Sequence, residues 1–279
     1  MKKVSKLVVL SLLSIGLFTT SCEKENTDLI EDDASIEVSE EIKAKLTSLA
    51  FNPSDVQVTD FVLPDGSTEK RYLVEGDIAL SKEYIETMEL NGGVTSEQYR
   101  TNNLVSAPRT LRVIGYTGGG GFGLSQSGRT GLQWAINNYN RENLELNFQL
   151  DFGTNYQSYD IVVYNNPNQS GSGGSAGFPS NGNPNKFVQI YGLSGSSNNV
   201  NEHVIAHEIG HSVGFRHTDY FSRQSCGQNV NEGQAGVGAV RIPGTPAGFD
   251  PGSIMLACFS NSTDGEWNNN DIIALNFLY

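Results

Sequence analysis

The sequence predicts an α+β fold built on a twisted mixed sheet, and three patterns support this prediction. Apolar and polar residues alternate strictly from Leu144 to Phe152, as in a strand with one buried face. Leu132, Ile136 and Tyr139 recur at the spacing of one helix face. The 31 glycines follow no Gly-x-y repeat, so collagen is excluded and a globular chain rich in loops is favoured.

The chain begins with a segment typical of a bacterial export signal. Three lysines precede the apolar run Leu7–Phe18, and small residues then lead to Cys22. This run is shorter than the roughly 20 residues that a helix needs to cross a bilayer. We therefore expect residues 1–22 to be a lipoprotein signal peptide, with a lipid on Cys22 that anchors the exported protein at the outer membrane or cell surface, on either face. The alternative is ordinary secretory cleavage, which would release the protein.

Acidic residues are concentrated in the N-terminal third of the chain. Residues 23–100 hold 19 acidic and 7 basic side chains, whereas residues 101–279 hold 12 acidic and 8 basic ones. The formal net charge of −13 excludes a broad electrostatic contact with nucleic acid or anionic lipid. Residues 23–40 have few large apolar side chains and are predicted to be an acidic tether.

The rest of the chain divides into two predicted regions near residue 100, where the composition changes. Residues 41–105 are predicted to be a small α/β domain or propeptide, and residues 106–279 the larger domain. Residues 165–186, rich in Gly, Ser and Asn, are expected to be a long surface loop. The other expected elements are helices around Ile42–Leu49, Leu132–Tyr139, Asn201–Val213 and Asp271–Tyr279, and strands at Val56–Val62, Tyr72–Leu80, Thr110–Tyr116, Leu144–Phe152, Asp160–Tyr164 and Phe187–Tyr191.

Three of the four histidines lie close together in the pattern HExxHxxGxxH. His207 and His211 are four residues apart, so a helix places both imidazoles on one face, where they can bind a single ion. Gly214 can adopt the left-handed conformation that ends a helix, which would turn the chain so that His217 returns as a third ligand. Three neutral imidazole nitrogens favour Zn²⁺ and leave a coordination position for water.

Glu208 is the expected catalytic residue of this pattern. Zinc lowers the pKa of its water to about 7, and the Glu208 carboxylate can take a proton as that water attacks a peptide carbonyl. A purely structural zinc site would not require Glu208. The alternative function, from another class, is therefore a lipid-anchored binding lipoprotein with a structural zinc.

The extended histidine pattern resembles that of the metzincin endopeptidases. The run from His207 to His211, followed by His217, Thr218 and Asp219, is similar to the dual-action HEIGH metallopeptidases among them. The resemblance covers roughly residues 110–279. It implies a zinc-dependent endopeptidase that acts on peptides or proteins, with an α/β upper subdomain and a C-terminal helix.

The same resemblance assigns roles to residues outside the histidine pattern. Metzincins have a methionine in a tight turn beneath the zinc, and Met255 matches that position. Phe187–Tyr191 resembles the edge strand to which extended substrates add as a further strand. Some metzincins bind the oxyanion with a Tyr two residues after the methionine, whereas this chain has Ala257 there.

Two cysteines remain once Cys22 is assigned to the anchor. Exported compartments favour disulfides, so we expect a bridge between Cys226 and Cys258, the alternative being two buried thiols. In the metzincin arrangement this bridge would brace the pocket beyond the scissile bond. Asp264 together with Asn268–Asn270 also offers oxygen ligands for Ca²⁺, although the spacing matches no known calcium loop.

A segment near the predicted region boundary suggests latency. Leu73–Ile78 resembles the FxGD segment of astacin-type propeptides, with Val74 in place of the Phe. In those propeptides an Asp occupies the zinc position, which implies that Asp77 is a latency switch. The alternative is a turn residue of a structural N-terminal domain. No cysteine lies between Cys22 and Cys226, which excludes a cysteine switch.

Overall fold

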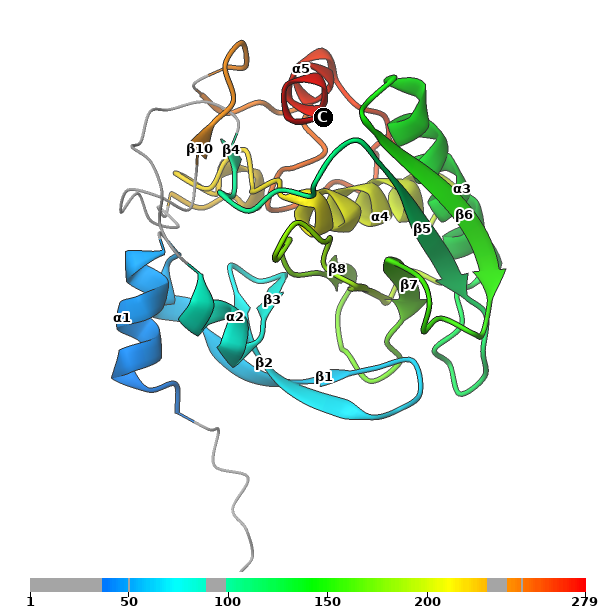
Figure 1. Cartoon of the computed structure of the whole chain (residues 1–279), viewed down its shortest axis with the longest axis horizontal. Helices are drawn as coiled ribbons and strands as arrows, with labels where there is room; N and C mark the ends of the chain where they lie inside the picture. The colour runs from blue at the N-terminus through cyan, green and yellow to red at the C-terminus, as the bar shows by residue number, and fades with distance from the viewer. Residues whose placement is uncertain (1–36, 50, 89–98, 230–239, 247) are drawn as a thin grey trace, which may run out of the picture. The chain divides into compact units, whose positions relative to one another are not determined.

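The computed structural model describes residues 37–49, 51–88, 99–229, 240–246 and 248–279 (Figure 1). They belong to one compact unit, Ser35–Tyr279. The predicted signal peptide, Cys22 and most of the predicted tether lie outside the described residues. Among the helices that are described, none combines the length and the apolar character needed to span a membrane.

A five-stranded mixed sheet organises residues 99–279, which we call the C-terminal region. The strands lie in the order β6-β5-β7-β9-β8, and all neighbours are parallel except β8 and β9. This arrangement confirms the predicted mixture of helices with a mixed sheet. The strands are β5 (Arg109–Tyr116), β6 (Leu146–Gly153), β7 (Ile161–Asn165), β8 (Gly173–Ser175) and β9 (Phe187–Tyr191).

Two long helices pack together against this sheet, α3 (Gln126–Arg141) and α4 (Asn198–Val213) (Figure 1). Each begins at a serine whose side chain accepts a hydrogen bond from a backbone N–H of the first turn. They approach closely at Gly131, where an added Cβ would lie 2.6 Å from the backbone nitrogen of Glu202. Every residue of α4 from Val200 to Val213 is buried.

The edge of the sheet differs from the prediction. Residues 165–186 were expected to form a surface loop, but they contain β8, whose three residues are buried. β8 is the edge strand, and Phe187–Tyr191 is an internal strand between β7 and β8. The prediction was wrong on both points because Gly173, Gly174 and Ser175 carry no apolar alternation that would mark a strand.

Residues 37–88, which we call the N-terminal region, contain two α-helices and three strands. Its three strands make an antiparallel sheet in the order β1-β2-β3. The predicted strand Tyr72–Leu80 is in fact two strands, because Glu75 and Gly76 adopt left-handed conformations, with φ of 55° and 91°. The elements are α1 (Glu40–Ser48), a 3-10 turn (Pro53–Asp55), β1 (Gln57–Val62), β2 (Thr68–Val74), β3 (Ile78–Leu80) and α2 (Lys82–Thr87).

The chain segment around residue 100 belongs structurally to the C-terminal region. β4 (Tyr99–Arg100) pairs with β10 (Val240–Arg241). The Thr101 N–H donates to the Gly214 carbonyl over 2.8 Å. The C-terminal helix α5 (Asn269–Leu278) follows the expected caps, since the Asn268 side chain accepts from backbone N–H groups of its first turn.

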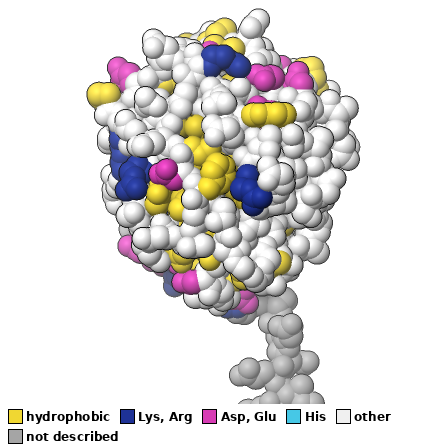
Figure 2. All heavy atoms as spheres, turned by 90° about the vertical axis from the view of Figure 1, so that its right-hand side faces the viewer, with side chains coloured by type: hydrophobic (Ala, Val, Ile, Leu, Met, Phe, Trp, Pro, Cys, Tyr) yellow, Lys and Arg dark blue, Asp and Glu magenta, His cyan; other side chains and the backbone are white. Residues whose placement is uncertain are grey.

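Charged side chains of both signs are scattered over the face that carries β6 and α3 (Figure 2). The described residues therefore present no broad basic surface on this face. Such a surface is the electrostatic mark of nucleic-acid binding.

Candidate metal centre

Helix α4 carries the first two predicted ligands and ends where the sequence predicted. Gly214 has φ of 115°, in the left-handed region, and its N–H donates to carbonyls of the last turn. A Cβ at this position would lie 2.8 Å from the Leu104 side chain. The chain thus leaves the helix sharply, and His217 comes back beside His207 and His211.

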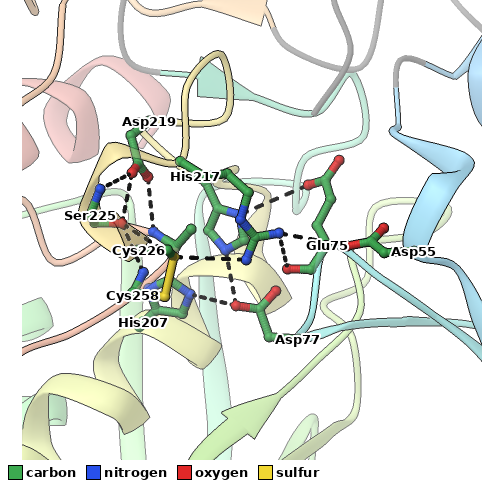
Figure 3. The surroundings of a disulfide bond; sticks show 11 residues. Asp55, Glu75, Asp77, His207, His217, Asp219, Ser225, Cys226 and Cys258 are labelled. Atoms are coloured by element: carbon green, nitrogen blue, oxygen red, sulfur yellow. Dashed lines mark hydrogen bonds and ion pairs between the residues drawn. A yellow bond between two sulfur atoms is a disulfide. The ribbon is translucent and has the colours of Figure 1, made fainter. Parts of the chain in front are cut away.

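The structure brings the three histidines together with Asp77. One ligand atom from each of the four residues can be chosen so that all lie within 4.8 Å of one another. Asp77 Oδ2 lies 3.0 Å from His217 Nε2 and 3.5 Å from His207 Nε2 (Figure 3). Asp77 Oδ1 lies 4.0 Å from His211 Nε2. All four residues come from the predicted set, although Asp77 is 130 or more positions away in sequence.

Hydrogen bonds fix which ring nitrogen of two histidines faces the cluster. His207 Nδ1 donates to the Ile254 carbonyl and His211 Nδ1 to the Phe215 carbonyl, each over 2.8 Å. Because a carbonyl can only accept, each ring proton lies on Nδ1. The buried Nε2 atoms have no hydrogen-bond partner among the described residues, and burial lowers the pKa of His211 well below its ordinary value. Neutral imidazoles with converging lone pairs fit a metal such as Zn²⁺.

Glu208 and His207 line the same cleft. Burial, and then the charge of Asp77, raises the pKa of its carboxyl well above the ordinary value. β8 passes so close that a Cβ on Gly174 would lie 2.5 Å from Glu208 Cγ. The glycine of the edge strand therefore makes room for this side chain.

The cleft has a volume of about 500 Å³ and is lined by Asp77, Tyr191, His207, Glu208 and Arg223, among others. A second hollow of about 440 Å³ adjoins it and is lined in part by Ser225, Phe249, Leu256 and Phe259. His203 lines both spaces. The histidine cluster thus opens onto a space large enough for substrate side chains.

Met255 packs against the helix that carries His207 and His211. It is buried, and its sulfur lies so near Gly210 that an added Cβ would be 2.6 Å away. The turn before it is held by α5, because Asp271 accepts from Ser253 Oγ over 2.7 Å and from the Ile254 N–H over 2.9 Å. Burial raises the pKa of Asp271 to about 6. Asp271 lies in the first turn of the capped helix α5, but no pattern in the sequence marks its contact with the turn before Met255.

The predicted disulfide is confirmed. Cys226 and Cys258 are bonded, with Cα atoms 5.1 Å apart. Asp219 joins the two flanking segments, since its carboxylate accepts from the N–H groups of Ser225 and Ala257 over 2.9 and 3.0 Å (Figure 3). The segment after His217 is therefore tied to the Met255 turn both covalently and by hydrogen bonds.

His203 and the residues expected to bind Ca²⁺ have other contacts. His203 packs beside Phe259 with its Nδ1 2.9 Å from Thr263 Oγ1, and burial lowers its pKa to about 3. The Asn268 oxygen caps α5, and the Asn270 amide donates to Asp250. The side chains of Asn268 and Asn270, which were expected to offer oxygen ligands to Ca²⁺, are thus used in these hydrogen bonds.

Two residues at the cluster were missed by the sequence analysis. Glu75, two positions before Asp77, forms a completely buried ion pair with Arg216, which directly precedes His217. The second carboxylate oxygen of Glu75 lies 3.9 Å from His217 Nδ1 (Figure 3). No local pattern marks a contact between residues this far apart in sequence.

Comparisons with known proteins identify the family of this chain. Two structures of myroilysin are similar to the chain, with 13% and 11% identity and TM-scores of 0.39 and 0.37. They cover 61% and 70% of this chain, and the chain covers 79% and 95% of theirs. No curated protein matches. The model of the dual-action HEIGH metallopeptidases matches residues 72–279, and the chain therefore belongs to this family of metallopeptidases.

Proposed function

We propose that this metallopeptidase is a zinc-dependent endopeptidase of the metzincin type, exported and lipid-anchored through Cys22. The observation that carries the proposal is the convergence of three histidine side chains, one of which, His207, lines a cleft together with the buried Glu208. His207, His211 and His217 would hold the ion, with Met255 beneath them. When bound, Zn²⁺ polarises the substrate carbonyl and acidifies a water molecule.

Glu208 then moves the proton. Its carboxylate accepts a proton from the attacking water as the water oxygen bonds to the carbonyl carbon, and it returns that proton to the leaving amine as the C–N bond breaks. In the latent chain, burial and then the charge of Asp77 raise the pKa of the Glu208 carboxyl. Because the charge of Asp77 is one cause of this shift, withdrawal of Asp77 would bring the pKa of the Glu208 carboxyl nearer to its ordinary value.

The edge strand β8 supports an extended peptide as substrate. Its position at the rim of the sheet, beside Glu208, suits binding by strand addition. In this chain the N-terminal region holds the adjoining position, because the Ala79 N–H donates to the Ala176 carbonyl over 2.7 Å and the Ala176 N–H to the Asp77 carbonyl over 3.0 Å. A substrate strand at β8 would compete with these contacts.

We further propose that the N-terminal region keeps the enzyme latent. Asp77 supplies a carboxylate to the three histidines, where substrate and water must enter. Although burial alone would raise the pKa of Asp77, the nearby histidines lower it overall, so the carboxylate stays charged. The segment Tyr99–Val105 is part of the C-terminal region, since Tyr99–Arg100 pairs with β10 and the Thr101 N–H donates to the Gly214 carbonyl. This favours a processing point within residues 89–98 over one at the predicted boundary near 105.

Replacement of Glu208 tests the proposed chemistry. In a chain cut within residues 89–98 to relieve the proposed latency, Glu208→Gln should retain zinc, measured by mass spectrometry of the purified protein, and should lose about 10²- to 10⁴-fold of its peptidase activity. Glu145→Gln, at an exposed glutamate, is the control and should keep its activity. Zinc retention with undiminished hydrolysis in Glu208→Gln would contradict the mechanism. A binding lipoprotein with structural zinc would show no hydrolysis in any variant.

A further inference from the structure

We propose that Arg216 and Arg223 form a cationic subsite that selects an acidic side chain of the substrate, and that Glu75 occupies this subsite in the latent chain. The inference rests on the proposed endopeptidase function and adds the class of substrate. It starts from the observation that the C-terminal region recognises one acidic residue of the N-terminal region at both its side chain and its backbone.

The side chain of Glu75 is bound by Arg216. Its carboxylate is paired with the guanidinium, and both side chains have an exposed fraction of 0%. Arg216 also lies over the ring of Phe51, with its Cζ 4.6 Å from the ring centroid. Burial of two charges is tolerated only when they remain paired, so the site requires a carboxylate at this point.

The backbone of Glu75 is bound by Arg223. The guanidinium donates to the Glu75 carbonyl over 3.1 Å, and the side chain lines the zinc cleft. Arg223 is held in place by its own backbone, which has φ of 48° and donates to the Asp219 carbonyl over 2.7 Å. The disulfide at Cys226 follows three residues later, so this arginine is fixed on the wall of the cleft.

The two arginines and the acid lie on opposite sides of the proposed processing point. Arg216 and Arg223 belong to the C-terminal region, whereas Glu75 and Phe51 belong to the N-terminal region. Withdrawal of Asp77 from the histidines must also withdraw Glu75, which is only two residues away. Arg223, which lines the cleft, and the buried Arg216 would then both lose this contact, and a substrate acid could restore the pairing.

The spacing predicts where the substrate acid lies. Asp77 lies at the histidine cluster, where the scissile carbonyl must bind. Glu75 precedes it by two residues, and its second carboxylate oxygen lies 3.9 Å from His217 Nδ1, so the selected acid is expected about two positions from the cleaved bond. The arginines lie on the side of the cleft formed by the segment after His217.

Matched peptides test the subsite. The full chain, cut by a specific protease at a recognition sequence placed within residues 89–98, is loaded with zinc and given peptides that carry Glu or Gln at each of three positions on either side of one cleavable bond. Because each ratio of kcat/KM compares Glu with Gln on the same enzyme, the active fraction cancels. We expect Glu to be preferred at least tenfold at one position, two residues from the cut.

Variants assign that preference to the arginines. Arg223→Gln should reduce the Glu-to-Gln ratio towards one, and Arg223→Glu should favour a Lys peptide instead. Arg112→Gln, on the distant strand β5, should leave the ratio unchanged. Arg216→Gln should also reduce the ratio, and if it does not fold, the two Arg223 variants decide the question.

Two results would overturn the subsite. One is equal cleavage of the Glu and Gln peptides by the unsubstituted enzyme, and the other is an equal gain from Glu at every position, which would indicate general charge attraction. Failure of the proposed function is distinguishable, since the zinc-loaded enzyme would then cleave neither these peptides nor an unfolded protein such as casein.

Discussion

The Asp271 carboxylate accepts a hydrogen bond from the Ile254 N–H, and the carbonyl of that same residue accepts from His207 Nδ1. One residue thus links the first turn of the C-terminal helix to a candidate metal ligand. Ser253 Oγ reinforces the link, because it donates to Asp271 and accepts from the Met255 N–H over 3.1 Å. Asp271 is therefore a positioning residue for His207, although it does not reach the metal centre itself.

This link predicts the effect of Asp271→Asn. The substituted amide retains one acceptor oxygen where two are used, so one buried donor loses its partner. We expect the free energy of unfolding to fall by about 1–3 kcal/mol and the zinc affinity to fall about 10- to 100-fold. Denaturant unfolding and competition with a chelator measure the two effects. Asp264→Asn, at an exposed site, is the control, and equal zinc affinity in both variants would refute the positioning role.

The parts of the fold that the sequence predicted are those with a local signal. Helix α4 could be predicted from two histidines four residues apart, and its end from Gly214, because a helix brings near neighbours in the sequence together. β6 was visible in its alternation. By contrast, β8 is defined by its pairing with β9, and Gly173 and Gly174 carry no side-chain pattern that could predict it.

The candidate site likewise combines residues that a local motif marks with residues that it does not mark. His207, Glu208, His211 and His217 lie in one continuous motif, so their convergence follows from local geometry. Asp77 was suggested only by a resemblance, since its contact with His217 spans 140 residues. The Glu75 partner of Arg216 is equally remote, and an isolated Glu in a turn gives no indication that it is buried.

Loss of the disulfide should destabilise the fold more than it affects the metal centre. The bond closes a loop with a sequence separation of 32, for which the chain-entropy model gives about 3–4 kcal/mol. We expect the double variant Cys226→Ser with Cys258→Ser to lose stability of this order in denaturant unfolding. Reductant should lower the stability of the unsubstituted protein by a similar amount and leave the double variant unchanged. A reductant effect on the double variant would contradict this assignment.

Glu202 should make stability depend on pH. Burial, then the nearby Glu266, raises its pKa to about 7 from an ordinary 4.5, against an opposing hydrogen bond from Asn138. Between these two values the unfolded chain releases the proton and the folded chain keeps it, so stability falls as pH rises from 4.5 to 7.

Glu202→Gln should remove this contribution, which amounts to about 3 kcal/mol at most. The measurement is the free energy of unfolding at several pH values from 4.5 to 8. The unsubstituted protein should lose stability relative to Glu202→Gln as pH rises, and Glu145→Gln should parallel the unsubstituted protein. A constant difference across this range would show that Glu202 titrates normally.

Asp77→Asn should activate the full-length chain. The amide cannot supply the charged carboxylate that faces His207, His211 and His217, so the N-terminal region should be held less tightly over the cleft. We expect peptidase activity at least tenfold above that of the unsubstituted chain, equivalent to about 1.4 kcal/mol. Asp60→Asn, in an exposed ion pair of the same region, should change nothing. Equal activity in all three proteins, without cleavage between Tyr72 and Pro108, would mean that Asp77 is a structural turn residue.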